Sequence, residues 1–377
     1  MKSDWKECTL AELGEIVGGA TPSTKDEQNY GGDIAWITPK DLSTLKGRFI
    51  SRGERNITEK GLRSCSAQIM PKNAVLFSSR APIGYVAIAA NPVCTNQGFK
   101  SIVANSDNDP MFLYYLLKYN KNAIEAMGSG TTFKEVSGST MRGIRVYVPI
   151  SKAEQQRIAA ILSALDEKIA INRAINDNLY EMVNAYYTSL FKEVECEMTT
   201  IDNYAERIYS GGTPATSNAT YWGGAFGWFS SGETRNRFVI STEKSITQTG
   251  IDNSSTKLAV KHDIVMASAG QGFTRGQTSM LLIDTYVNQS VIVIHADRNI
   301  LPYLFWNLAN RYEELRAISD SSSIRGSLTT KMIAAFEIPL ANNDVIQTFS
   351  DFAWAVIPKI ENNLLENERL VALRDSL

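Results

Sequence analysis

The residues of this sequence whose type and spacing most clearly suggest a function are lysines and arginines, which are concentrated in one stretch. Between Lys40 and Arg80 there are nine basic residues and three acidic ones, a local net charge of +6. Lysine and arginine neutralise phosphate oxygens, and arginine also hydrogen-bonds the edge of guanine. The stretch is therefore a candidate phosphate-binding surface. A solvated charged face of an ordinary domain has the same sequence signature.

The charge of the whole chain limits the kind of partner. The formal net charge is −2, whereas a protein that coats nucleic acid is normally basic throughout. A basic stretch on a weakly acidic chain instead fits a local phosphate footprint.

The sequence lacks the motifs that are typical of catalytic sites. There is no G-x-x-x-x-G-K-[ST] loop for nucleotide phosphates, and His262 and His295 are the only histidines. No serine or cysteine has a plausible histidine-centred triad. Asn91-Pro92-Val93-Cys94 is similar to the Asn-Pro-Pro-aromatic motif of adenine methyltransferases but lacks its second proline and its aromatic residue, which favours a turn. We expect a binding protein without catalysis, cofactor or metal.

Composition favours an ordinary globular protein of the cytoplasm. With 377 residues, 44% of them hydrophobic, the chain has room for two or three domains with cores. The four cysteines are scattered and contain no C-x-x-C pair, as is typical of reduced thiols. No apolar run approaches the ~18 residues that a membrane helix needs, and no apolar stretch at the start suggests a signal peptide.

The sequence repeats itself after a shift of 192 positions. At that shift, the residues Gly19, Thr21, Pro22, Thr24, Gly31, Gly32, Trp36 and Asn96-Gln97 fall on Gly211, Thr213, Pro214, Thr216, Gly223, Gly224, Trp228 and Asn288-Gln289. Shared Gly, Pro and Trp predict shared turns and a shared core, in which Trp36 and Trp228 are buried. A common scaffold with different surfaces fits two recognition tasks, although a duplication kept only for stability would look the same.

Each repeat combines a strand- and turn-rich part with a long helix. Apolar residues recur at every third or fourth position from Ile158 to Leu190, and no Pro or Gly occurs from Ser151 to Val194. This pattern predicts one helix of roughly 40 residues, about 60 Å long at 1.5 Å per residue. A second long helix is predicted from about Asn342 to the end, and a shorter one from Pro110 to Met127.

The apolar stripe of each long helix is too narrow to form a core alone, so the two are predicted to pack along their length as a coiled coil. Asn172, Asn176, Asn363 and Asn367 fall on or beside the seam, where polar residues fix register at a cost in stability. Because one turn of B-DNA is ~34 Å, such a rigid pair could hold two reading modules about a turn apart. A helical hairpin that merely closes the structure would have the same pattern.

The chain resembles the specificity (S) subunit of type I restriction-modification systems. The central helical region of that family is similar to the segment Pro149-Ile150-Ser151-Lys152-Ala153-Glu154-Gln155-Gln156-Arg157-Ile158-Ala159. The family's target recognition domain is similar to Ser78-Ser79-Arg80-Ala81-Pro82-Ile83-Gly84-Tyr85 and Thr95-Asn96-Gln97-Gly98-Phe99. The second repeat departs from this pattern, with Ala269-Gly270-Gln271 where the first has Arg80-Ala81-Pro82.

The resemblance implies an α+β fold with two similar α/β target recognition domains and two long antiparallel coiled-coil helices. Its implied boundaries are target recognition domain 1 at 1–149, a central helix at 150–195, target recognition domain 2 at 196–340 and a C-terminal helix at 341–377. Each domain would read one half of a gapped double-stranded DNA target. The helices would set the gap and dock two methyltransferase subunits, which bring S-adenosylmethionine and flip out the target adenine. Restriction/translocase subunits are the further implied partners.

Direct readout of bases needs polar side chains at base edges, and phosphate contacts need cations. The candidate DNA contacts of the first domain are Lys40, Arg48, Arg52, Arg55, Arg63, Arg80, Thr132 and Lys134. Those of the second domain are Arg235, Arg237, Gln271, Arg275 and Arg325. Two other classes of protein stay open at this point, a protein scaffold built from a duplicated domain and a self-sufficient methyltransferase or nuclease.

Overall fold

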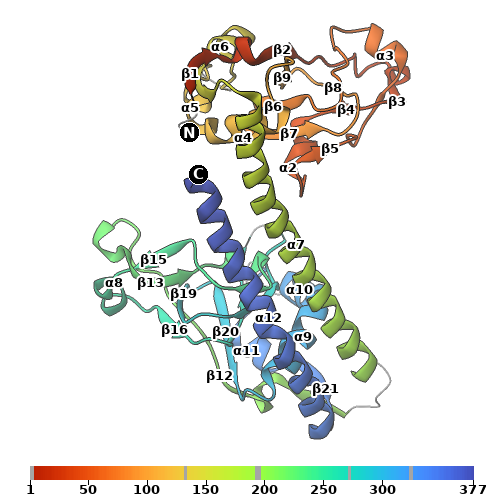
Figure 1. The fold of residues 1–377 in the computed structure, drawn as a ribbon. Coiled ribbons are helices and arrows are strands. Elements are labelled where there is room, and N and C mark those ends of the chain that lie inside the picture. Colours follow the sequence, from red (N-terminus) through yellow and green to blue (C-terminus); the bar gives the residue numbers. More distant parts are fainter. Residues whose placement is uncertain (1–3, 131–133, 192–196, 271–272, 322–325) are drawn as a thin grey trace. The chain divides into compact units, whose positions relative to one another are not determined.

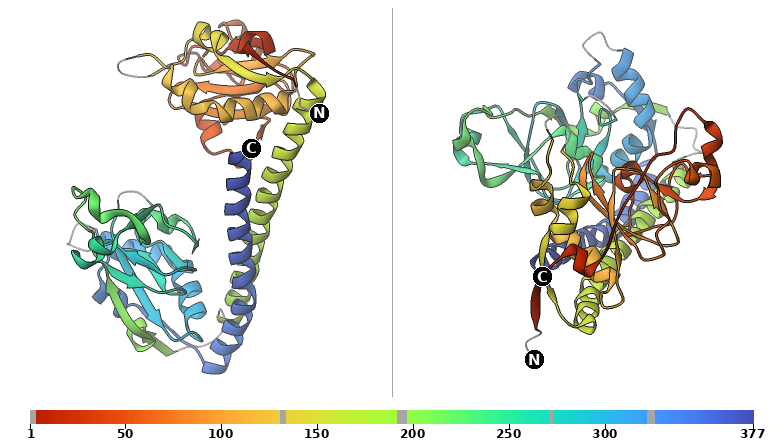
Figure 2. Two further views of the ribbon diagram at one scale, coloured as in Figure 1. Left: turned by 60° about the vertical axis from the view of Figure 1, so that its left-hand side comes forward. Right: turned by 90° about the horizontal axis from the view of Figure 1, so that it is seen from above.

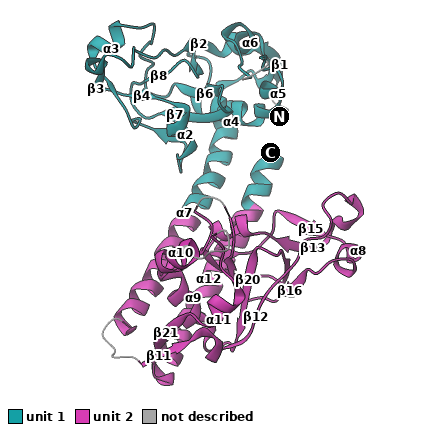
Figure 3. Cartoon of the chain, turned by 180° about the vertical axis from the view of Figure 1, so that it is seen from behind, with its two compact units in different colours: residues 1–170, 370–377 teal, residues 171–369 magenta. Residues whose placement is uncertain are grey.

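The computed structural model of the chain describes residues 4–130, 134–191, 197–270, 273–321 and 326–377, which fall into two compact units (Figure 1; Figure 3). Unit 1 comprises residues 1–170 and 370–377, and unit 2 comprises residues 171–369. Helices and mixed sheets occur in both units, which confirms the predicted α+β class.

Unit 1 is built on a sheet that, in the described part of the chain, has five strands in the order β2-β9-β6-β7-β5. The strands of this unit are β1 (Trp5–Thr9), β2 (Gly14–Gly18), β3 (Tyr30–Ile34), β4 (Trp36–Ile37), β5 (Phe49–Ile50), β6 (Val75–Ser79), β7 (Ile83–Ala89), β8 (Cys94–Thr95), β9 (Lys100–Ala104) and β10 (Arg145–Pro149). Its helices are α1 (Leu10–Leu13), η1 (Glu27–Asn29), α2 (Pro39–Ser43), α3 (Glu59–Arg63), α4 (Pro110–Tyr119), α5 (Lys121–Ala126) and α6 (Gly138–Gly143). β5 and β7 are parallel, and the other neighbours in this sheet are antiparallel.

The single helix predicted from Pro110 to Met127 is wrong, because the structure has two helices that meet at Asn120. The side-chain amide of Asn120 donates to Leu116 O at 2.8 Å, the same carbonyl that accepts its backbone N–H. Asparagine favours such local hydrogen bonds over a continuous helix. The apolar face of α4, with Leu113 and Leu117, packs into one core with Val75 and Phe77 of β6.

Unit 2 repeats this architecture with a sheet of five described strands in the order β12-β20-β17-β18-β14. Its strands are β11 (Glu197–Thr200), β12 (Ala205–Ser210), β13 (Trp222–Phe229), β14 (Phe238–Val239), β15 (Lys244–Ile246), β16 (Lys257–Ala259), β17 (Ile264–Ala267), β18 (Thr278–Leu281), β19 (Thr285–Val287), β20 (Val291–Ala296) and β21 (Glu337–Leu340). Its helices are η2 (Ile201–Asn203), η3 (Ala219–Tyr221), η4 (Ser231–Arg235), α8 (Gln248–Asp252), α9 (Leu301–Asn310), α10 (Tyr312–Ser321) and α11 (Thr330–Ala334). β14 and β18 are parallel, as β5 and β7 are in unit 1.

The sequence repeat is preserved in the register of the strands. Trp36 of β4 lies opposite Cys94 of β8, and Trp228 of β13 lies opposite Tyr286 of β19, in parallel pairs at the same shift of 192 positions. Trp36 is 6% exposed and Trp228 is 5% exposed, so both are buried as predicted. The two repeats therefore share strand pairing and core positions.

One repeated glycine shows why the turns are shared. Gly61 and Gly250 lie in the first turn of the helices α3 and α8, where each donates its N–H to the side chain of the threonine three residues before it at 3.1 Å. A Cβ on Gly61 would lie 2.2 Å from Asn29 O, and one on Gly250 would lie 2.6 Å from Tyr221 O. Any side chain at these two positions would clash with backbone, so glycine is required in both copies.

Two long helices complete the fold, α7 (Lys152–Phe191) and α12 (Asn343–Ser376). They run side by side in opposite directions, as Figure 2 shows, which confirms the predicted antiparallel pair. Residues 192–194 of the predicted first helix lie outside the described residues. Pro358 lies inside α12 and, because it has no N–H, leaves one helical hydrogen bond unmade.

The predicted polar seam residues contact one another across the two helices. Asn172 donates to Asn367 Oδ1 at 3.0 Å and to Glu366 Oε2 at 2.7 Å. Asn363 donates to Asn176 Oδ1 at 2.8 Å. Because these groups pair only in one register, they fix how α7 and α12 slide against each other within unit 2.

The start of α7 is fastened to unit 1 by a buried glutamine. Gln155 donates to Asn108 Oδ1 at 2.8 Å and to Pro149 O at 3.1 Å, and it accepts from Asp109 N at 2.9 Å. Its side chain thus joins the first turn of α7, the end of β10 and the first turn of α4.

We predict that Asn172→Ala lowers the free energy of unfolding by about 1–3 kcal/mol, because Asn367 Oδ1 loses its donor inside the seam. The double variant Asn172→Leu with Asn367→Leu should recover most of this loss, since it removes both partners together. Urea unfolding followed by circular dichroism measures both values. An Asn172→Ala protein as stable as the wild type would contradict the role of this pair.

Candidate nucleic-acid interface

Four predicted DNA contacts of unit 1 lie on its surface, namely Lys40, Arg52, Arg55 and Arg63. Lys40 pairs with Glu54 at 2.6 Å, Arg52 lies 4.0 Å from Asp33, and Arg63 lies 3.9 Å from Glu59. Exposed pairs of this kind contribute little to stability, so a phosphate can replace the carboxylate at little cost.

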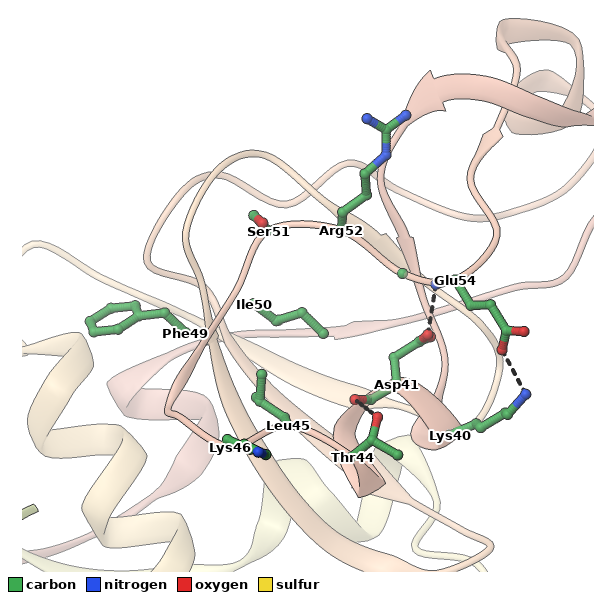
Figure 4. A pocket seen from close by; sticks show the side chains of 11 residues that line it. Lys40, Asp41, Thr44, Leu45, Lys46, Phe49, Ile50, Ser51, Arg52 and Glu54 are labelled. Carbon is green, nitrogen blue, oxygen red and sulfur yellow. Dashed lines mark hydrogen bonds and ion pairs between the residues drawn. The ribbon is translucent and has the colours of Figure 1, made fainter. Parts of the chain in front are cut away.

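Lys40, Lys46 and Arg52 line one surface pocket of unit 1 (Figure 4), and Asp41 organises it. Asp41 Oδ2 accepts from Thr38 N at 2.7 Å and from Thr38 Oγ1 at 2.6 Å, which caps α2. Asp41 Oδ1 accepts from Glu54 N at 2.8 Å. One carboxylate therefore fastens the segment that carries Arg52 to the start of α2.

The same arrangement occurs in unit 2, where Glu233 stands 192 positions after Asp41. Glu233 Oε1 accepts from Ser230 N at 2.8 Å and from Ser230 Oγ at 3.0 Å, and its Oε2 accepts from Glu243 N at 2.8 Å. Our sequence reasoning missed these two acids. Their signal was a capping-box spacing, Thr38-x-x-Asp41 and Ser230-x-x-Glu233, at the repeat distance.

A second group of cations in unit 1 gathers around Glu135. Arg80 Nη1 lies 3.5 Å and Lys100 Nζ lies 3.3 Å from this carboxylate, and Lys134 beside it is exposed. Only Arg80 and Lys134 of these were predicted, since Lys100 is distant in sequence and comes close only through β9.

Arg142 of α6 belongs to the same group. A Cβ built on Gly138 would lie 3.6 Å from Arg142 Nη1 and 3.8 Å from Lys100 Cε, so both side chains pass over that glycine. We call Arg80, Lys100, Lys134 and Arg142 the Glu135 cluster. Arg80 and Lys100 pair with Glu135, and Lys134 and Arg142 add two further positive charges nearby, so the group has a net positive charge that suits an anion.

Two predicted contacts have partners inside the chain. Arg48 donates to Tyr115 Oη at 3.2 Å and to Ser163 O at 3.4 Å, and its side chain is 12% exposed. Arg275 is 11% exposed and is hydrogen-bonded to Gly326 O and Asp320. Because both side chains are largely buried and are already hydrogen-bonded within the chain, we assign Arg48 and Arg275 a supporting role.

The remaining predicted residues of unit 2 are Arg235 and Arg237, both exposed. Arg235 pairs with Glu243 and donates to Gly232 O at 2.8 Å. Arg237 lies over the ring of Tyr180 on α7, with its guanidinium 4.1 Å from the ring centre. Thr132, Gln271 and Arg325 lie outside the described residues.

The last turn of α12 is held within unit 1 by a partly buried carboxylate, Asp166 of α7. Asp166 accepts from Arg374 Nη1 and from Tyr115 Oη, each at 2.8 Å. Burial alone would raise the pKa of Asp166, but these hydrogen bonds outweigh it and hold the pKa below its usual range. Asp166 therefore contributes most in its ionised form.

The fold and these surfaces define a duplicated α/β protein on two long antiparallel helices, with cations presented from its loops. Residues 2–181 and 194–366 match the family described as the type I restriction modification DNA specificity domain. Since the match takes in most of the chain, the protein belongs to this family. The resemblance noticed in the sequence is confirmed.

Similar proteins carry the same description. The chain is 44% identical over 194 residues to the type I restriction enzyme MjaIX specificity subunit of Methanocaldococcus jannaschii, over 51% of this chain and 45% of that protein. It is 28% identical over 184 residues to the HindI specificity subunit of Haemophilus influenzae, over 47% of this chain and 39% of that protein. The chain therefore aligns with less than half the length of each of these two relatives.

The crystal structure of a type I restriction-modification S subunit from M. genitalium has the same fold, with a TM-score of 0.62. The superposition takes in 100% of this chain and 95% of that one, at 17% sequence identity.

Two further observations concern the described residues alone. Among them, no helix is both long and apolar enough to cross a bilayer. Nor do three or more His, Cys, Asp or Glu side chains in that part of the chain come together in a way that could hold a metal ion.

We predict that Asp166→Asn destabilises the protein at pH 7 by about 1–2 kcal/mol, because Arg374 loses one of its two carboxylate partners, Asp166, and keeps only Asp375. The folded pKa of Asp166 is depressed, so its contribution is present above the unfolded pKa and disappears as pH falls through the folded pKa. The difference between variant and wild type should therefore shrink as the pH falls below about 4, the usual pKa of an aspartate. Urea unfolding at several pH values measures it, with the exposed Asp33→Asn as control. A difference independent of pH would contradict the assignment.

We also predict that Asp41→Ala loosens the segment from Ser51 to Glu54. Loss of the cap on α2 should lower the free energy of unfolding by about 1 kcal/mol. Amide hydrogen exchange at Glu54 should accelerate, because its N–H loses the carboxylate acceptor. Exchange measured by mass spectrometry tests this, and an unchanged rate across residues 51–54 would show that Asp41 does not hold the segment.

Proposed function

We propose that this chain is the sequence-reading subunit of a type I restriction-modification complex, in which each of its two domains recognises one half of a gapped double-stranded DNA target. The observation that carries the proposal is the duplication itself. Strand order, register and capping carboxylates are kept between the two units, while the loops on them differ. A constant scaffold with two different surfaces is suited to reading two different half-sites.

The proposed domains are 1–149 and 196–340, with the helical regions 150–195 and 341–377 setting the gap between the half-sites. We further propose that these helices dock two methyltransferase subunits. In support, Ile171, Ile175 and Met182 of α7 are 54%, 41% and 45% exposed, and their spacing places them on one face. An apolar helix face of this kind suits a partner helix.

Catalysis is assigned to the partners. The methyltransferase subunits would supply S-adenosylmethionine and the base-flipping pocket, and restriction/translocase subunits would join the larger complex. This chain would contribute recognition only and act in the cytoplasm, where the DNA of a prokaryotic cell lies.

Within this scheme the cations fall into two groups. Lys40, Arg52 and Arg63 lie on an exposed surface and suit phosphates, which position a protein without specifying sequence. Arg80 of the Glu135 cluster follows a buried strand and keeps a third of its side chain exposed, which suits a base edge. In unit 2, Arg235 and Arg237 are the described candidates. Thr132 of the first domain and Gln271 and Arg325 of the second remain predictions from the sequence.

A methylome tests the proposal directly. The chain is expressed with its partner methyltransferase subunit in a methylation-free host, beside the methyltransferase alone, and modified adenines are mapped by single-molecule sequencing. A gapped two-part motif that is modified only when this chain is present is the expected result. No new methylation by a soluble, associated complex would instead favour a protein scaffold. An ungapped motif would mean that one domain alone reads DNA.

We predict different outcomes for two neighbouring residues. Arg80→Ala should relax the motif at one position of one half-site, by about 1–3 kcal/mol of discrimination. Lys134→Ala should weaken binding to all sequences alike and lower the salt dependence. Both are measured on the assembled complex with cognate and scrambled duplexes. An Arg80→Ala complex with the wild-type motif, affinity and salt dependence would remove Arg80 from the interface.

A further inference from the structure

Unit 1 holds a cation on an aromatic ring that itself packs against a buried tryptophan. The guanidinium of Arg55 lies 4.0 Å from the centre of the Tyr30 ring. The Tyr30 ring meets Trp36 edge-on, with 5.9 Å between ring centres and an interplanar angle of 71°. Arg55 stands two residues before the buried Ile57.

Unit 2 contains the same stack with different residues. The ammonium of Lys244 lies 5.7 Å from the centre of the Trp222 ring. The Trp222 ring meets Trp228 edge-on, at 4.9 Å and 86°. Lys244 stands two residues before the buried Ile246, which aligns with Ile57 in the sequence repeat.

The rings of Tyr30 and Trp222 contribute to packing, whereas Arg55 and Lys244 are not needed to cover the core. Tyr30 and Trp222 are partly exposed and cover the buried indoles of the two stacks. Arg55 and Lys244 are exposed and add a charge above that cover. Within the described part of the chain, neither forms an ion pair with a carboxylate, unlike Lys40, Arg63 and Arg235 nearby.

The two units share the type of contact at this place, a cation over an aromatic ring, but not the amino acids that form it. Unit 1 has an arginine and a tyrosine where unit 2 has a lysine and a tryptophan, yet in both units a cation lies over an aromatic ring at the same place. Elsewhere the surfaces have diverged, since the loop with Arg80 in unit 1 corresponds to a longer loop with the exposed Phe273 in unit 2.

Two half-sites of different base sequence have one chemical group in common, the phosphate backbone. A surface cation kept in both units therefore suits phosphate, whereas a residue that reads bases would be expected to differ. One face of each ring is covered by the cation, so these rings are not bare platforms for base stacking.

We infer that Arg55 and Lys244 make equivalent contacts to DNA phosphates in the two half-sites, with Tyr30 and Trp222 as the rings that position them. The inference rests on the proposed function. It adds Lys244, which the sequence did not single out, and it assigns Arg55 to the backbone rather than to a base.

The test uses the complete complex of this chain with its methyltransferase partner. Binding to a fluorescein-labelled duplex with the identified motif, and to a scrambled duplex, is measured over a series of KCl concentrations. Arg55→Gln and Lys244→Gln should each lower the slope of log affinity against log salt by about 0.9 on both duplexes, the value for one lost phosphate contact in B-DNA. The methylated motif should stay unchanged.

Matched variants separate charge from folding. Arg55→Lys keeps the charge and should keep the slope, and Tyr30→Phe keeps the ring and should do the same. Arg145→Gln removes another exposed cation, one that is paired with Glu7 on the strand pair β1–β10, and it should leave the slope unchanged. Thermal unfolding and complex formation confirm that each variant is folded.

Two outcomes would overturn the inference, namely an unchanged slope in both glutamine variants or a changed base preference in one half-site. Failure of the proposed function is visible earlier and separately, because the wild-type complex would then neither methylate a gapped motif nor prefer it over the scrambled duplex.

Discussion

In each unit the indole N–H of a buried tryptophan must be hydrogen-bonded to a backbone carbonyl. This requirement fixes the path of the chain segment that carries the carbonyl. Trp36 Nε1 donates to Ala20 O at 3.0 Å, and Trp228 Nε1 donates to Gly212 O at 3.3 Å. Each acceptor directly precedes a Thr-Pro pair that is shared by the two units, in which Thr21 is hydrogen-bonded to Gln97 and Thr213 to Gln289. An unpaired indole N–H would cost about 1–3 kcal/mol, so turn, ring and sheet are fixed together.

The sequence predicts well what is periodic or repeated. The long helices could be predicted from the spacing of apolar residues, which is a local signal. The burial of Trp36 and Trp228 could be predicted because the same residue occurs at the same place in both repeats. The break at Asn120 was missed, since one side-chain hydrogen bond decides it. The contact that brings Lys100 to Glu135, the carboxylate next to Arg80, depends on strand order, which no local pattern in a single sequence reveals.

Burial separated the predicted cations in a way that residue type could not. Arg48 and Arg63 belong to the same basic stretch, yet one is enclosed by α4 and α7 and the other is 83% exposed. Asp41 and Glu233 show the reverse case, in which acids of a basic surface position the loops that carry its cations. The charge of the sequence from Lys40 to Arg80 therefore located the basic surface. Only the structure showed which of its residues are exposed and which support the fold.

The bond between Asp166 and Arg374 has a consequence for synthesis. Residues 370–377 belong to unit 1, although the whole of unit 2 is translated between them and residue 170. A chain that leaves the ribosome from its N-terminus can form the sheet of unit 1 early, but that unit is complete only when residues 370–377 have emerged. Until then Asp166 lacks Arg374, and a nascent chain that stalls after unit 2 would carry an N-terminal domain without its final helical turns.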